Sequence, residues 1–219
     1  MCNQYAPETS AALIAKLFNA QWSEDEMNWK DEVYPKYQAP VVRMKEGRRI
    51  VDSMAWGFPT QVQGKTKMLT KHVTNARNLA SPFWKGSAMN PERRCLVPFR
   101  RFAEPRPGKD PITGRPANWW FSIADQPVAA FAGLWRPTEQ GAVFAFATCE
   151  PNALVAPLHE KAMPVILLAE DNDRWLTGDY ADVLALQAPY PSQLMMLADG
   201  GLPPTDTTSV AENAQGNLI

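Results

Sequence analysis

The second residue of this 219-residue chain is a cysteine that directly follows the initiator methionine. If Met1 were removed, Cys2 would carry an α-amine and a thiol on one residue. The α-amine, with a pKa of about 7.7–8, is partly neutral at pH 7, whereas a lysine amine is not. These two nucleophiles can condense with an aldehyde to an imine, which the thiol then closes to a thiazolidine. A cysteine at position two also occurs by chance, so both interpretations stay open.

A second group that could do chemistry contains Asn75 and Arg77, which follow the basic segment 65–72. The Asn75 amide could hold a reactive group, or it could cap a helix expected over residues 74–79. The planar guanidinium of Arg77 suits a phosphate, although a solvated surface arginine fits the sequence as well. These residues predict polar contacts, but the sequence leaves open whether the partner is the protein itself or a bound phosphate or reactive group.

Glu104 and His159 are the candidates for acid or base chemistry. Burial beside aromatic side chains, such as a hairpin partner at Trp119 or Trp120, would raise the pKa of Glu104. The alternative is an exposed carboxylate paired with a neighbouring arginine. His159 precedes an apolar segment, and a general base near pH 7 should be His159 or His72, the only two histidines. The alternative for His159 is a structural hydrogen bond.

The other two cysteines, Cys95 and Cys149, have apolar neighbours and are predicted to pack in the core. An odd number of distant cysteines argues against a disulfide framework. The sequence has no CxxC or HxxxH spacing, so we expect no metal site and no cofactor.

Charge is segregated along the chain although the net charge is only −1. Residues 36–115 hold 17 Lys and Arg against 5 Asp and Glu, and the remainder holds 5 against 18. Such a basic segment predicts a surface for a polyanion, unless the two regions neutralise each other in the fold. No apolar run approaches the roughly 18 residues of a membrane span, and the N-terminus lacks secretory-signal features. We therefore expect a soluble cytoplasmic protein with no membrane partner.

The elements that must position these residues are short, and 20 prolines favour turns over long helices. Hydrophobic patterns predict strands over 40–44, 49–56, 94–99, 118–123, 128–135, 142–148 and 164–168, helices over 11–20, 74–79, 151–158 and 171–186, and a hairpin loop over 105–116. This order predicts an α+β fold in one domain over residues 1–195. Its core is a mostly antiparallel, β-barrel-like sheet with a few short peripheral helices. Residues 196–219 are expected to form a flexible tail.

Taken together and in order, the motifs resemble those of the SOS response-associated peptidase (SRAP) family of abasic-site processing proteins. The resemblance runs from residue 2 to about 185 and rests on Met1-Cys2, Tyr37-Gln38-Ala39-Pro40, Trp56-Gly57-Phe58, Asn75-Ala76-Arg77, Arg94-Cys95-Leu96-Val97-Pro98 with Phe102 and Glu104, Ala132-Gly133-Leu134-Trp135, Thr148-Cys149-Glu150-Pro151-Asn152, and His159 with Met163-Pro164-Val165-Ile166-Leu167.

The resemblance implies a single domain on a β-barrel-like core, with a basic groove for single-stranded DNA. It also implies that Cys2, freed of Met1, forms a thiazolidine crosslink with the ring-opened aldehyde of an abasic site. Asn75 would then hold the N-terminal cysteine, Glu104 would act as acid and base, and His159 would assist proton transfer. Such a protein would remove its own Met1 and could slowly reverse the crosslink in a lyase-type reaction.

The DNA contacts implied by the resemblance start with Arg77, which would bind a phosphate beside the lesion. Trp56, Arg101 and Lys161 are further expected DNA contacts, and the protein is expected to act as a monomer. Gln4 stands where the family usually has an arginine. We therefore expect a shallower salt dependence of DNA binding than in relatives with that arginine.

Two other function classes use the same residues. Cys2 could be the nucleophile of an N-terminal amidase or autoprotease, with its own amine as base. Alternatively, the basic surface and the eight tryptophans could bind single strands without any chemistry. The basic segment 36–115 favours the two nucleic-acid hypotheses, and the coincidence of Cys2 with Asn75, Glu104 and His159 favours covalent capture.

Overall fold

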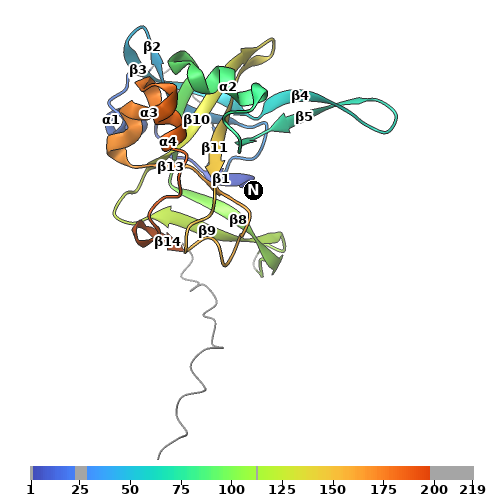
Figure 1. Cartoon of the computed structure of the whole chain (residues 1–219). Helices are drawn as coiled ribbons and strands as arrows, with labels where there is room; N and C mark the ends of the chain where they lie inside the picture. The colour runs from blue at the N-terminus through green and yellow to red at the C-terminus, as the bar shows by residue number, and fades with distance from the viewer. Residues whose placement is uncertain (1, 23–28, 112, 198–219) are drawn as a thin grey trace, which may run out of the picture.

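Five strands close into a barrel at the centre of the computed structural model, which describes residues 2–22, 29–111 and 113–197. They are β2 (Gln38–Lys45), β3 (Arg48–Trp56), β7 (Arg94–Phe99), β10 (Ala129–Thr138) and β11 (Gly141–Cys149). Antiparallel pairs join β3 to β2, β2 to β7, β7 to β10 and β10 to β11, and a parallel pair between β11 and β3 closes the ring. The predicted α+β class with a barrel core and short helices is confirmed (Figure 1).

Aromatic side chains fill the barrel. The Phe99 and Phe131 rings stack with centroids 3.9 Å apart, and Phe146 lies 4.7 Å from Phe131. The Tyr5 ring packs edge-on against Phe131 and Phe146, so the N-terminal segment is anchored in the same core. Every residue of β7 is buried, which explains why its sequence reads as a continuous apolar run after Arg94.

A second sheet lies beside the barrel and carries the N-terminus. Its strand order is β1 (Gln4–Ala6), β8 (Arg101–Lys109), β9 (Pro116–Ile123) and β14 (Met195–Leu197). Figure 1 shows this sheet below the barrel, with the N-terminus near the junction of the two sheets. The loop predicted over 105–116 is shorter, because β8 continues to Lys109. Two residues assigned to the predicted tail belong to β14, and residues 198–219 lie outside the described part.

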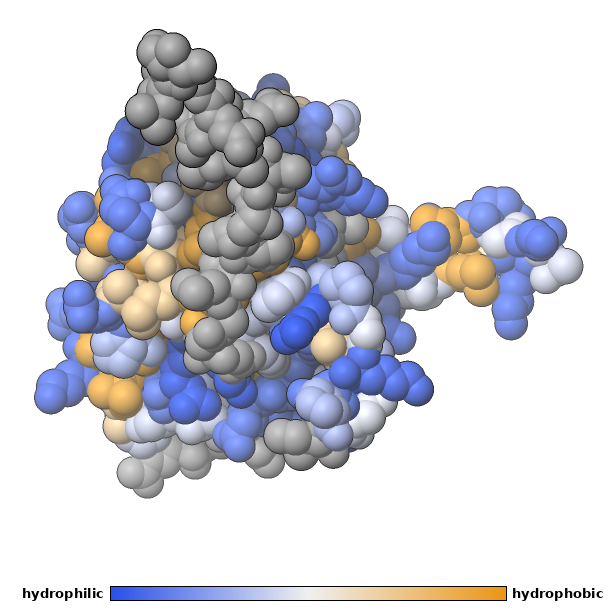
Figure 2. Space-filling view, turned by 90° about the horizontal axis from the view of Figure 1, so that it is seen from below, coloured by the Kyte–Doolittle hydropathy of each residue, from blue (hydrophilic) through white to orange (hydrophobic). Residues whose placement is uncertain are grey.

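A hairpin of β4 (Phe58–Gln63) and β5 (Met68–Val73) projects from the body (Figures 1 and 2). Its two strands pair only with each other among the described strands. The sequence between Asp52 and Glu92 contains no acidic residue, so the hairpin is purely cationic. Its exposed apolar surface belongs to Met68 and Leu69, which are 54% and 42% exposed.

The helix predicted over 74–79 is wrong. Residues Asn75–Ala76 form β6, which pairs in parallel with Phe146 and Ala147 of β11. The carbonyl of Thr74 accepts a hydrogen bond from the Trp56 indole at 3.2 Å, which holds the start of this strand. A long-range pairing therefore overrides the local capping signal of the Thr-Asn pair.

The helices are short and lie at the periphery. They are α1 (Ala11–Leu17), α2 (Pro82–Met89), α3 (Asn172–Thr177) and α4 (Tyr180–Ala185), with 3-10 turns η1 (Pro91–Arg93), η2 (Ala169–Asp171) and η3 (Ser192–Leu194). The two remaining short strands are β12 (Met163–Pro164) and β13 (Ile166–Leu167). The predicted helix over 151–158 is wrong, since this segment forms only hydrogen-bonded turns. No described helix is long and apolar enough to cross a membrane.

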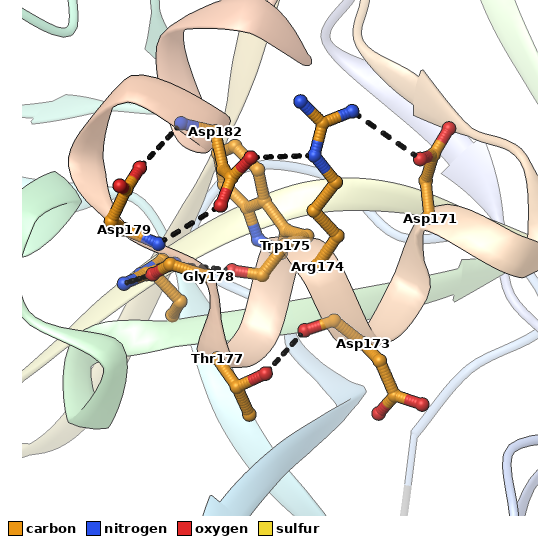
Figure 3. A network of polar contacts seen from close by, with 9 residues as sticks. Asp171, Asp173, Arg174, Trp175, Thr177, Gly178, Asp179 and Asp182 are labelled. Carbon is orange, nitrogen blue, oxygen red and sulfur yellow. Dashed lines mark hydrogen bonds and ion pairs between the residues drawn. The ribbon is translucent and has the colours of Figure 1, made fainter.

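The predicted helix over 171–186 is divided into α3 and α4 at Gly178. A capping box between Asp179 and Asp182 starts α4, and Arg174 links Asp182 to Asp171 (Figure 3). The buried Arg94 guanidinium donates to the carbonyls of Trp175 and Gly178 at 2.7 Å each. Arg94 thus satisfies carbonyls at the end of α3 and fixes the helix pair on the barrel.

Candidate active site at the N-terminal cysteine

Cys2 lies just before β1, whose pairing with β8 brings the N-terminus beside Glu104. In the chain that still carries Met1, Cys2 is 1% exposed, and its thiol donates to the Gln4 carbonyl at 3.3 Å. Burial raises the pKa of the Cys2 thiol well above its usual value, and the Glu104 carboxylate adds to this effect. The thiol is therefore protonated at neutral pH and needs a base before it can attack.

Asn75 contacts Cys2 directly. Its amide nitrogen donates to the Cys2 carbonyl at 3.1 Å and to the Thr74 hydroxyl at 2.8 Å. Its amide oxygen is buried and has no hydrogen-bond partner among the described residues. An amide oxygen only accepts hydrogen bonds, so Asn75 offers an acceptor beside the N-terminal cysteine.

The buried Glu104 forms a pair next to Cys2 with His159, whose side chain is 14% exposed. Glu104 is 0% exposed, and its Oε2 lies 3.6 Å from Nε2 of His159. The exposed, arginine-paired alternative for Glu104 is therefore wrong. Burial raises the pKa of Glu104 to about 7, which keeps a proton available near neutral pH.

The tautomer of His159 follows from its backbone contact. Nδ1 lies 2.9 Å from the Ala162 carbonyl, which can only accept, so Nδ1 carries the hydrogen. In the neutral ring Nε2 then has a lone pair directed at Glu104. Burial lowers the pKa of His159, which favours this neutral form. The structure thus brings Cys2, Asn75, Glu104 and His159 together.

Arg77 is held at the end of β11, close to Asn75 in sequence. Its guanidinium donates to the Cys149 carbonyl and forms an ion pair with Glu150. Its own carbonyl accepts from the Gln187 amide at 2.7 Å. Because the Arg77 and Glu150 side chains are 40% and 74% exposed, a phosphate could reach Arg77 only in competition with Glu150.

Trp56 is not a DNA-contacting residue. Its side chain is fully buried, and its ring stacks on Phe146 with centroids 5.2 Å apart. Through its bond to the Thr74 carbonyl it supports the strand that carries Asn75. The prediction of a surface role fails because the end of β3 enters the barrel core.

The other expected DNA contacts lie at the surface. Lys161 is exposed two residues after His159. Arg101 is partly exposed, lies 3.8 Å from Glu32, and covers the Trp120 ring at 4.3 Å. Gln4 is only 7% exposed.

Sequence reasoning missed the surroundings of Gln4 and the burial of the Thr148 hydroxyl. The Gln4 amide donates to Glu32 at 2.9 Å and accepts from Asn118 at 2.8 Å. The Thr148 hydroxyl is buried without a hydrogen-bond partner among the described residues. Its place at the start of the Thr148-Cys149-Glu150 motif was the only signal. No cluster of His, Cys, Asp or Glu in the described part could hold a metal ion.

Comparison with solved structures shows the same fold in several proteins. A Bordetella bronchiseptica protein is 22% identical with a TM-score of 0.70, covering 89% of this chain and 97% of its own. A Bacteroides thetaiotaomicron protein is 20% identical with a TM-score of 0.70, covering 89% and 90%. A phage-related protein from Bordetella bronchiseptica is 20% identical with a TM-score of 0.62, covering 89% and 92%.

The family comparison covers all of the residues that the structure describes. No curated protein gave a significant match. A family model described as SOS response associated peptidase (SRAP) matches residues 1–199. Since this match spans most of the sequence, the chain belongs to the SRAP family and has a function associated with DNA damage.

Proposed function

We propose that this protein captures abasic sites in single-stranded DNA as a covalent crosslink through Cys2, after Met1 has been removed. The observation that carries this function is the contact of Asn75 with the Cys2 carbonyl beside the pair of the buried Glu104 and the partly buried His159. This arrangement puts an amide acceptor and a proton-transfer pair around one N-terminal residue. The protein would act as a monomer on cytoplasmic DNA.

The chemistry starts with the abasic sugar, which must open from its cyclic hemiacetal to the aldehyde. The Cys2 amine adds to the aldehyde carbon, and the resulting carbinolamine loses water to give an imine. The thiol then adds across the carbon–nitrogen double bond, forming a carbon–sulfur bond while its proton passes to nitrogen. The product is a thiazolidine, and one water molecule leaves overall.

Each polar group has a role in this sequence. The Asn75 amide holds the Cys2 carbonyl, and its unsatisfied oxygen can accept a hydrogen bond from the freed amine. Glu104, with a pKa of about 7, can donate the proton that water needs to leave and later accept the thiol proton. His159, whose Nε2 lone pair faces Glu104, would assist opening and closing of the sugar.

Removal of Met1 is a condition of the proposal, because an acylated Cys2 has no free amine. The same thiol and acid–base pair could cleave the bond between Met1 and Cys2, which fits the peptidase in the family description. Slow reversal of the crosslink would be the corresponding lyase-type activity.

Charge favours a nucleic-acid substrate over a small amide. The hairpin that leads to Asn75 carries exposed Lys65, Lys67 and Lys71 and no acidic residue. Neutralising phosphates with such cations releases counterions, which is the main source of affinity for a DNA backbone. A hydrolase of small amides has no use for this surface.

A denaturing gel tests the function. The wild-type chain should give a denaturation-resistant adduct with abasic single-stranded DNA, and Cys2→Ala should give none. Cys2→Ser is the matched control for size and polarity. It should also give no stable adduct, because an oxazolidine hydrolyses more readily than a thiazolidine. Strong binding without any adduct in the wild type would leave the non-covalent binding module as the function.

A further inference from the structure

The β8–β9 hairpin carries a row of side chains from the core to the rim of the candidate site. Glu104 of β8 pairs directly with Trp119 of β9, so these side chains share one face of the hairpin. The same face carries Phe102 and Phe121, whose buried rings stack at 5.2 Å. Trp119 is only partly buried, so its ring lies where this row reaches the surface.

Arg106 extends the row by one more position. It lies two residues beyond Glu104 on β8, and its guanidinium is 4.4 Å from the centroid of the Trp119 ring. Arg106 is exposed and forms no ion pair with a carboxylate in the described part of the chain. A cation and an aromatic face are therefore held together beside Glu104, and none of the described carboxylates neutralises the charge.

We propose that Trp119 and Arg106 form a nucleotide-binding subsite for the base and phosphate next to the lesion. This subsite rests on the function proposed above, since it lies beside the residues assigned to capture. Sites for single strands combine an aromatic ring, on which a base stacks, with cations along the backbone. The Arg106 guanidinium, which now covers the ring, moves to the phosphate when a base takes its place.

Trp120 provides a matched control within the same strand. It pairs with Ala103, so its side chain lies on the opposite face of the hairpin from Glu104. An arginine, Arg101, covers its ring at 4.3 Å. Trp119 and Trp120 thus share residue type, strand and cation–aromatic contact, and differ in the face that they occupy.

Affinity should be measured by fluorescence anisotropy with a single-stranded oligonucleotide that contains one tetrahydrofuran abasic analogue. This probe has no aldehyde, so it reports binding without capture. A second oligonucleotide also lacks the bases on both sides of the analogue. Wild type should lose about 5- to 150-fold in affinity for the second probe, the range of one lost base–aromatic stack.

The variants then separate stacking from structure. Trp119→Ala should bind the first probe as weakly as wild type binds the second, and should not distinguish the two probes. Trp119→Phe should restore the discrimination, and Trp120→Ala should discriminate between the two probes as strongly as wild type does. Equal affinity of wild type for both probes would overturn the subsite, whether or not Trp119→Ala folds. The subsite would also be overturned if Trp119→Ala lowered the affinity for both probes by the same factor.

Crosslinking to aldehyde-bearing DNA distinguishes this subsite from the proposed function. An adduct in wild type without discrimination between the two probes would reject the subsite and keep covalent capture. Discrimination without an adduct would keep the subsite and reject capture.

Discussion

Nε2 of His159 lies 3.6 Å from Oε2 of Glu104, while Nδ1 of the same ring is held by the Ala162 carbonyl. The ring can therefore exchange a proton with Glu104 only through Nε2. Burial acts on the two groups in opposite directions, raising the pKa of Glu104 to about 7 and lowering that of His159. Near pH 7 Glu104 is therefore divided between its acid and carboxylate forms, beside a mostly neutral imidazole, which suits reversible proton transfer.

Glu104→Gln should slow capture by about 10²- to 10⁴-fold, the usual effect of losing a general acid or base. In wild type the rate should rise as the Cys2 amine loses its proton, and fall as Glu104 ionises above its pKa of about 7. Glu104→Gln should lose this decline at alkaline pH. Adduct formation followed in time from pH 5 to 9 measures both effects; an unchanged alkaline limb would exclude Glu104 as the acid.

His159→Ala should slow capture mainly of the cyclic sugar, because His159 is assigned to ring opening. Glu104→Gln should slow capture even of a substrate already in the aldehyde form. His159→Ala should also slow release, since a shared transition state is crossed in both directions. Time courses of formation and release with cyclic and pre-opened substrates separate the roles. Equal losses of both variants on both substrates would contradict this division.

The buried Glu104 should make the fold less stable at alkaline pH. Its folded-state pKa of about 7 is above the ordinary glutamate pKa of 4.5, so the folded state binds more protons than the unfolded state between these values. Stability should therefore fall as pH rises from about 4.5 through 7, by about 3 kcal/mol in total. Glu104→Gln, which cannot ionise, should be the more stable protein at pH 8. Urea unfolding at pH 5 and 8 measures this; a larger wild-type stability at pH 8 would be contrary to it.

Arg77 and Glu150 should have opposite effects on DNA affinity. Arg77→Ala should weaken binding by about 1.5–3 kcal/mol, the value of a charge-assisted hydrogen bond. Glu150→Gln removes the competing carboxylate and should strengthen binding by up to about 1 kcal/mol, as expected for an exposed ion pair. Anisotropy titrations of both variants provide the measurement. Weaker binding by Glu150→Gln would mean that Glu150 orients Arg77 instead of competing with the phosphate.

Gln4 leads to a prediction that differs from the one based on sequence alone. Because Gln4 is buried against Glu32, an arginine at position 4 would pair with that carboxylate. Gln4→Arg alone should therefore leave the salt dependence of binding unchanged. Gln4→Arg combined with Glu32→Gln should steepen the logarithmic slope by about 0.7, the value for one phosphate on a single strand. A steeper slope in the single variant would show that position 4 reaches the DNA directly.

The elements predicted best are those whose own residues dictate burial. The strand over residues 94–99 agrees with β7 to the residue, because six consecutive positions are buried in the barrel. The strand at Asn75–Ala76 depends instead on a parallel pairing with β11. In this pairing Asn75 lies opposite Phe146, which is 71 residues further along the chain. The β4–β5 hairpin was missed because its exposed β5 lacks the alternation that marks a half-buried strand.

The site residues show the same division. The sequence left open whether Glu104 is buried or exposed. In the structure β8 lies between β1 and β9, with Glu104 opposite Trp119, and this pairing buries the carboxyl group. Trp56 was misplaced at the surface because aromatic residues serve both cores and nucleic-acid contacts. The partner of Arg77 could not be predicted, since Glu150 meets it only through the fold.

Intact mass spectrometry tests covalent capture by Cys2 most directly. The wild-type protein should first be mixed with a single-stranded oligonucleotide in which a glycosylase has converted one uracil to an abasic site. The mass should equal that of the chain without Met1 plus the oligonucleotide minus one water, and Cys2→Ala should give only the unmodified masses. The same adduct in Cys2→Ala, or an adduct on a chain that retains Met1, would contradict capture by the freed cysteine.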